Sequence, residues 1–169
     1  MITPIKPNIF ALEFLEFGSN VYLIKINNQN ILIDTSSRAN QEELINYLKE
    51  LNINPKEINI LILTHNHWDH VENKELFQNA KIYGHKKDFE TKEILPIEEL
   101  TIKEFKIIKT PGHTKGSFCI LYDKILFSGD TIFHQGIGRT DFPESSPTEM
   151  IKSLEKIKKL DFEILCPGH

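Results

Sequence analysis

Residues 61–70 read LILTHNHWDH and place three histidines and an aspartate within six consecutive positions. They continue INILIL (58–63), a short apolar run rich in β-branched residues that is typical of a buried strand. The ends of such strands are where α/β proteins gather their functional groups. Three imidazoles this close would repel one another if protonated, whereas a divalent cation binds each ring in its neutral form. The stretch therefore predicts an α/β fold with a metal site at a strand end.

Length and composition are those of an ordinary soluble globular protein, and they exclude several classes. The 169 residues fit one domain, 1–169, with 40% hydrophobic and 26% charged residues. A net charge of −4 and a pI near 6.0 do not indicate a basic surface that would bind nucleic acid. No apolar run approaches the roughly 18 residues that span a membrane, and MITPIKPNIF lacks the apolar region of a signal peptide. We expect a cytoplasmic protein in which Cys119 and Cys166 are reduced core residues, with a disulfide between them as the less favoured alternative.

Periodicity predicts alternating strands and helices along the chain. Strands are expected at 9–17, 20–26, 30–35, 58–63, 81–84, 104–110, 117–122, 124–130 and 162–165. Helices are expected at 40–51, 71–78 and 146–160, and 88–99 is open between helix and loop. Asn40 and Glu43 are spaced as a capping box, while Ser146, Pro147 and Glu149 mark the start of the last helix.

Three more polar residues follow apolar runs. His113 stands in KTPGHTKGS, Asp130 in ILFSGDTIF and His169 in EILCPGH. A single histidine after a strand is usually a surface residue, but these groups converge on one rim if their strands lie side by side. With the first cluster they give five imidazoles and two carboxylates, enough to hold two metal ions. The predicted ligands are His65, His67, Asp69, His70, His113, Asp130 and His169.

In this order THNHWDH, PGHTKGS, FSGDT and a closing PGH resemble the metallo-β-lactamase superfamily across essentially the whole chain. The resemblance implies a single-domain, four-layer αββα sandwich with a dinuclear site at one edge of two sheets. It assigns one ion to His65, His67 and His113, and the other to Asp69, His70 and His169. Asp130 would bridge the two ions. Asp34 matches a family position that supports the ligands by hydrogen bonding.

The same resemblance narrows the choice among the branches of the superfamily. The β-lactamases carry cysteine where this chain has Asp130, and flavin-linked diiron proteins carry glutamate at the position of His67. The RNA-processing branch brings extra domains and a basic surface. The GIGRTDFP run (136–143) resembles both the small glyoxalase II-like hydrolases and the persulfide dioxygenases.

The favoured function is hydrolysis of a thioester by a metal-bridging hydroxide, with Asp69 and Asp130 as catalytic positions. Zinc is favoured for the two divalent ions, and iron or manganese are alternatives. The second hypothesis is oxidation of a persulfide at one iron held by His65, His113 and Asp130. A third is a metal-binding module without turnover. A small-molecule substrate is expected, and binding to nucleic acid or to a membrane is not. Whether the chain forms a homodimer is left open.

Other residues near these motifs have expected roles. Arg139 is expected to make bidentate hydrogen bonds that hold the loop after Asp130, with a direct substrate contact as the alternative. His134 could line the pocket, His85 less so, and Trp68 is expected to pack beside the site. Full-length glyoxalase II has a C-terminal region for glutathione, whereas this sequence stops at His169, so glutathione specificity is not expected.

Overall fold

The computed structural model describes residues 1–169, which divide into two compact units. Unit 1 comprises Met1–Leu63 and His67–Tyr83, and unit 2 comprises Thr64–Asn66 and Gly84–His169. The division passes through the histidine run, so that His65 belongs to unit 2 and the next ligand along the chain belongs to unit 1. One domain over 1–169 stays a prediction.

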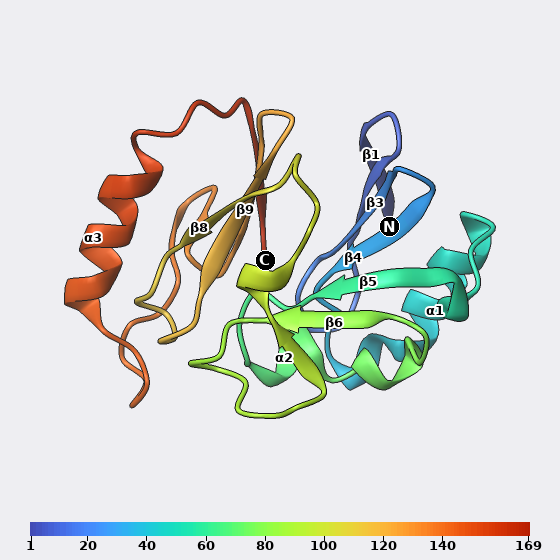
Figure 1. The fold of residues 1–169 in the computed structure, drawn as a ribbon, viewed down its shortest axis with the longest axis horizontal. Helices are drawn as coiled ribbons and strands as arrows, with labels where there is room; N and C mark the ends of the chain where they lie inside the picture. The colour runs from blue at the N-terminus through green and yellow to red at the C-terminus, as the bar shows by residue number, and fades with distance from the viewer. The chain divides into compact units, whose positions relative to one another are not determined.

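Unit 1 is built on a mixed sheet whose strands are hydrogen-bonded in chain order. The strands are β1 (Ile2–Lys6), β2 (Ile9–Leu12), β3 (Val21–Ile26), β4 (Gln29–Ile33), β5 (Ile58–Ile62) and β6 (Lys81–Gly84). The pairs from β1 to β4 are antiparallel, whereas β4, β5 and β6 run parallel. Figure 1 shows β3 to β6 side by side. The parallel strands are apolar because they are buried, and Ile31, Leu32 and Leu61 are fully inaccessible to solvent.

The helices of unit 1 are short. They are α1 (Gln41–Glu50) and α2 (Trp68–Val71), with 3-10 turns at Arg38–Asn40, Pro55–Glu57 and Lys74–Leu76. Helix α1 confirms the predicted helix at 40–51, but the capping box predicted for Asn40 is wrong. The side-chain amide of Asn40 (Nδ2) instead donates to Ser36 Oγ (2.9 Å) and to the Glu16 carbonyl (3.1 Å). A capping box does form before β5, between Asn54 and Glu57.

Unit 2 contains the second sheet, with strands in the order β13-β10-β9-β8. These strands are β8 (Lys106–Lys109), β9 (Phe118–Tyr122), β10 (Ile125–Gly129) and β13 (Ile164–Pro167); β7 (Ile94–Pro96), β11 (Ile132–Phe133) and β12 (Gly136–Ile137) also fall in this unit. Strand β9 is antiparallel to both β8 and β10, and β10 is parallel to β13. It follows that β8, β10 and β13 point the same way, so their carboxyl ends share one edge.

Helix α3 (Pro147–Ile157) covers the second sheet, as Figure 1 shows for β8 and β9. Its predicted start is confirmed, because Ser146 Oγ accepts a hydrogen bond from the Glu149 amide at 3.3 Å. Ile157 packs with Ile108, Cys119 and Leu126. Both cysteines are free and buried, as predicted. None of the helices combines the length and apolar character needed to cross a membrane.

Three other predictions about elements were wrong or incomplete. The strand expected at 9–17 ends at Leu12, because the carbonyls of Glu16 and Phe17 accept side-chain donors rather than a strand partner. The helix expected at 71–78 begins at Trp68 and ends at Val71. It stops because the Asn73 amide N–H donates to Thr35 Oγ1 (3.2 Å) instead of extending the helix. Segment 88–99 becomes β7 and a 3-10 turn at Ile97–Glu99.

Candidate metal centre

The shared edge of β8, β10 and β13 brings three predicted ligands together in unit 2. His113 follows β8, Asp130 follows β10 and His169 follows β13. Asp130 Oδ2 lies 3.4 Å from His113 Nε2 and 3.7 Å from His169 Nε2. Two ligand atoms of a tetrahedral zinc ion, each about 2.0–2.2 Å from the metal, are separated by about 3.4 Å. The spacing of these side chains therefore suits ligands of a common ion.

His169 is held in place although it is the last residue of the sequence. The Gly168 amide donates to the Gly129 carbonyl at 2.9 Å, which extends the parallel pairing of β13 with β10. The imidazole also lies edge-on to Phe133, with ring centroids 6.1 Å apart. These contacts fix His169 beside Asp130.

His65 joins the same cluster because residues 64–66 belong to unit 2. The Phe118 amide donates to the Thr64 carbonyl at 3.4 Å and ties this segment to β9. The rings of His65 and His113 have centroids 4.8 Å apart and an interplanar angle of 77°. Unit 2 thus gathers four of the seven predicted ligands, and three of them, His65, His113 and Asp130, are buried.

Gly129 allows the close packing that places Asp130. Its φ of +48° is in the left-handed region, and a Cβ there would lie 2.8 Å from Thr64 Oγ1. A side chain at this position would be strained and would also displace the segment that carries His65. The glycine of the FSGDT motif is therefore required where β10 passes Thr64.

Unit 1 carries the other three predicted ligands around the short helix α2. His67 is the residue before the helix, and Asp69 and His70 lie within it. Main-chain groups outside the helix hold it in place. The Asp69 carbonyl accepts a hydrogen bond from the Ser19 amide, and the His70 carbonyl accepts one from the Thr35 amide. Asp69 and His70 are buried, whereas His67 is half-buried.

Hydrogen bonds to two of the histidines determine which ring nitrogen is available for a metal. His113 Nδ1 lies 2.8 Å from the Arg139 carbonyl oxygen, which can only accept, so Nδ1 carries the proton. His70 Nδ1 lies 2.8 Å from Asp34 Oδ2, and both residues are buried. In each neutral ring the Nε2 lone pair is then the metal-binding atom, as in many metal sites. The donors therefore fit a divalent cation, and each of the seven residues offers one ligand atom.

The side chains of Arg139 and Trp68, which were also singled out from the sequence, make contacts outside these clusters. Arg139 makes the predicted bidentate contact, donating to Asp141 at 2.9 and 2.8 Å, and its guanidinium lies 4.4 Å from the Phe142 ring centroid. Both partners of that ion pair are exposed. Trp68 packs on Phe17 at 5.8 Å between ring centroids and is 55% exposed.

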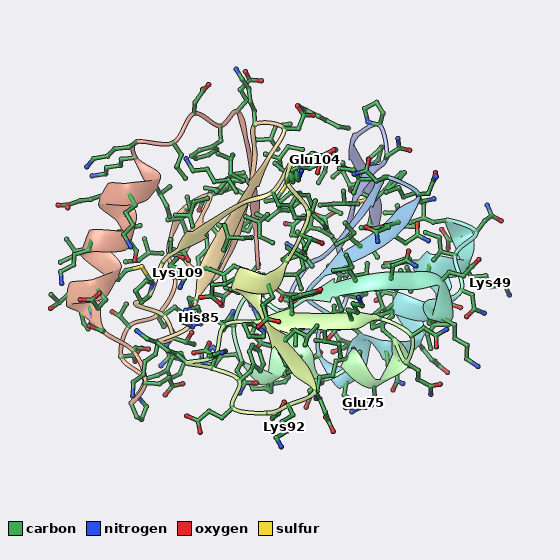
Figure 2. The ribbon with its side chains drawn as sticks, viewed as in Figure 1. Lys49, Glu75, His85, Lys92, Glu104 and Lys109 are labelled. Atoms are coloured by element: carbon green, nitrogen blue, oxygen red, sulfur yellow. The ribbon has the colours of Figure 1, made fainter.

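The two other histidines have different surroundings. His85 is buried, accepts the Lys87 amide N–H at Nδ1 (3.2 Å), and has Nε2 3.7 Å from Glu98 Oε1. The same carboxylate oxygen lies 2.5 Å from Lys109 Nζ, and Figure 2 labels His85 and Lys109. Burial lowers the pKa of His85 from its usual value. His134 is exposed in the turn between β11 and β12.

Two supporting groups could not be found from the sequence. The Arg139 carbonyl, which orients His113, is a main-chain group that every residue possesses. Thr64, whose hydroxyl lies 3.1 Å from His65 Nδ1, is adjacent to the motif but is an ordinary strand residue by pattern. Asp34, in contrast, was predicted to support the ligands, and its hydrogen bond to His70 confirms that contact.

Imidazoles and carboxylates at the carboxyl ends of parallel strands are the features of a metal-binding α/β protein. The family model described as the metallo-beta-lactamase superfamily matches residues 15–85 and 73–169. The chain therefore belongs to the metallo-β-lactamase superfamily, whose members bind divalent metal ions and include hydrolases. The predicted fold class is confirmed by this match.

Three similar proteins illustrate the relationship. A "probable metallo-hydrolase" of Methanocaldococcus jannaschii is 36% identical over 143 residues, which are 82% of this chain and 70% of the relative. A hydroxyacylglutathione hydrolase of Citrobacter koseri is 34% identical over 165 residues, 90% of this chain, and the match spans 62% of that enzyme's length. The crystal structure of ETHE1 from Myxococcus xanthus has a TM-score of 0.79 and 25% identity, covering 95% of this chain and 75% of that one.

Proposed function

We propose that this chain is a metal-dependent hydrolase that cleaves thioesters. The observation that carries the proposal is the cluster in unit 2, where one buried carboxylate, Asp130, faces the imidazoles of His113 and His169. The similarity to a hydroxyacylglutathione hydrolase supports the thioester as the substrate class.

The thiols of the chain do not offer an alternative nucleophile. Burial raises the pKa of Cys119 to about 11 and that of Cys166 to about 12, so neither forms a thiolate near neutral pH. Neither cysteine is therefore available as the attacking nucleophile, and direct attack by water on the thioester gives a carboxylic acid and a free thiol.

The ligand assignment follows the family pattern. His65, His67 and His113 would hold one divalent ion, and Asp69, His70 and His169 would hold the other, with Asp130 shared. When bound, such ions act as Lewis acids and lower the pKa of water to about 7, which makes hydroxide available at neutral pH. Zinc is the favoured metal, and iron and manganese accept the same donors.

The chain's own residues orient and polarise the reactants. The Arg139 carbonyl and the Asp34 carboxylate hold the protons of His113 and His70 on Nδ1, so both rings present Nε2. Asp130 is the one carboxylate among the four ligands gathered in unit 2, and it can accept a hydrogen bond from the attacking water and so orient it. Asp69 is the second predicted catalytic position, on the unit 1 side of the motif.

A second candidate function, oxygen-dependent oxidation of a persulfide, is favoured by a different feature of the same unit. Two histidines and one carboxylate, His65, His113 and Asp130, are gathered within unit 2 alone. This is the donor set of the facial arrangement that binds non-haem iron. The GIGRTDFP run, which resembles persulfide dioxygenases, supports the same alternative.

The deciding experiment begins with protein purified without added metal or chelator, whose metal content is measured by mass spectrometry. The same preparation is assayed for thiol release from a panel of thioesters and for oxygen consumption with a persulfide. About two ions per chain and thiol release that is lost in Asp130→Ala support the hydrolase. One iron per chain with persulfide-dependent oxygen uptake supports the dioxygenase. Full thioester turnover by Asp130→Ala would overturn the proposed role of this carboxylate.

A further inference from the structure

Asp88 connects the two chain segments that carry His65 and His113. Its carboxylate accepts hydrogen bonds from Thr114 Oγ1 (2.6 Å), the Gly116 amide (2.6 Å) and the Asn66 amide (3.2 Å). The Asp88 carbonyl also accepts from the Asn66 side-chain amide at 3.0 Å. Asn66 is adjacent to His65, and Thr114 is adjacent to His113. All these residues belong to unit 2.

The site around this carboxylate leaves little room for another side chain. A Cβ on Gly116 would lie 2.6 Å from Asp88 Cγ, so the glycine permits the close approach of the loop after His113. Thr114 Oγ1 is also 2.7 Å from Ser117 Oγ, which accepts from the Thr114 amide at 3.1 Å. The loop after His113 is thus closed on itself and attached to Asp88.

The chemistry of the contact requires an acceptor at every position. An ionised carboxylate has about four lone-pair sites and no donor, which matches three incoming N–H and O–H groups. Hydrogen bonds to a charged acceptor are roughly twice as strong as neutral ones. An asparagine would keep one oxygen but would turn its NH₂ group toward one of the donors.

Asp88 itself has a fixed position. Its amide donates to the His85 carbonyl at 2.9 Å, in the turn that follows β6. The carboxylate therefore comes from a third part of the chain and contacts two segments that are separated by about fifty positions in the sequence. Removing it would take away the hydrogen bonds that link residues 64–66 to residues 114–116 through this carboxylate.

We propose that Asp88 is a positioning residue that sets the separation and relative orientation of the His65 and His113 rings, and thereby the affinity for the ion they hold. The inference rests on the proposed function, because it takes these two histidines as ligands. Asp88 acts through the main-chain amide of Asn66 and the side-chain hydroxyl of Thr114, the residues that follow His65 and His113 in the sequence. Outer groups of this kind commonly change metal affinity by about 10–100-fold when they are replaced.

The test compares Asp88→Asn and Asp88→Ala with a matched control, Asp161→Asn. Asp161 is 86% exposed in its side chain and approaches Lys124 at 3.7 Å, away from the ligands. Zinc affinity of the metal-free proteins is measured by competition with a chromophoric chelator. The visible spectrum of the cobalt-loaded proteins reports ligand geometry, and the melting temperature of the metal-free proteins reports fold stability.

We expect zinc binding about 10–100-fold weaker in both Asp88 variants, with an altered cobalt spectrum, and native values for Asp161→Asn. Thr114→Val removes one of the three donors and should weaken binding in the same direction by a smaller factor. This variant carries the test if Asp88→Ala does not fold. Native affinity and a native cobalt spectrum in Asp88→Asn, whatever its melting temperature, would overturn the positioning role alone. A native chain that binds no ion would overturn the proposed function together with it.

Discussion

Asp34 provides the sharpest test of how the ligands of unit 1 are supported. Its Oδ2 lies 2.8 Å from His70 Nδ1, and both side chains are buried, so solvent has little access to replace the contact. The residue has φ of +60°, a conformation that asparagine and aspartate tolerate better than other residues with a Cβ. Asp34→Ala therefore removes the acceptor and also places alanine in a strained backbone position. Asp34→Asn keeps an acceptor oxygen and tolerates the same backbone.

The expected cost of Asp34→Ala can be summed from these two effects. Leaving the His70 donor buried without this acceptor costs about 1–3 kcal/mol. The left-handed conformation adds roughly 1–2 kcal/mol for a residue such as alanine. The total is about 2–5 kcal/mol, which corresponds to a fall in melting temperature of roughly 4–20 °C for a chain of this size.

Metal affinity should fall as well, by about 10–100-fold in Asp34→Ala, because the Nδ1 proton of His70 is no longer held. Asp34→Asn is the matched control and should lose much less in both measurements. Thermal unfolding of metal-free protein and zinc competition with a chelator give the two quantities separately. Equal melting temperatures and equal zinc affinities for Asp34→Ala and the native chain would refute the reasoning.

Four further outcomes are expected. Ser146→Ala removes the cap of α3 and should cost about 1 kcal/mol, lowering the melting temperature by about 2–4 °C without changing metal content. Arg139→Ala should leave metal content unchanged in mass spectrometry, because the carbonyl that orients His113 remains; loss of metal would refute this. Cys119 and Cys166, with pKa values raised to about 11 and about 12, should react with a thiol reagent at pH 8 only after unfolding. The thiols ionise at a lower pH in the unfolded chain than in the folded one. The contribution of the buried thiols to the free energy of unfolding is therefore complete below a pH of about 8.5 and is lost as the pH rises through 11 to 12. Chemical denaturation at several pH values would detect this loss.

Residue type and spacing were enough to predict much of this structure. The apolar runs that became β3, β4, β5 and β10 are largely buried, and β10 is buried throughout, so most positions in them carry the same signal. Helix α3 was predicted with its first residue because serine, proline and glutamate each have a local role at a helix start. The polar residues that end these strands were visible for the same reason.

Elements that depend on distant partners were not predictable in the same way. Strand β1 has half-exposed residues and exists because it pairs with β2, and the β11–β12 hairpin has only two residues in each strand. Helix α2 is four residues long because its neighbours use the main-chain groups that would otherwise extend it. Asn40 was expected to cap a helix by spacing, but nearby serine hydroxyls and the Glu16 carbonyl bind its amide.

The ligands of the candidate site and the groups that hold them differ in how they are encoded. A ligand needs a side chain that can bind a metal, such as histidine, aspartate, glutamate or cysteine, so few residue types are suitable and the motif stands out in the sequence. The group that orients His113 is a carbonyl, and two of the three donors to Asp88 are main-chain amides. Such groups are present in every non-proline residue and leave no mark on residue type. Arg139 was noticed for its guanidinium, yet its carbonyl is the part that contacts a ligand. The geometry of a metal centre is thus encoded largely by the path of the chain, and a three-dimensional structure is needed to find the residues that control it.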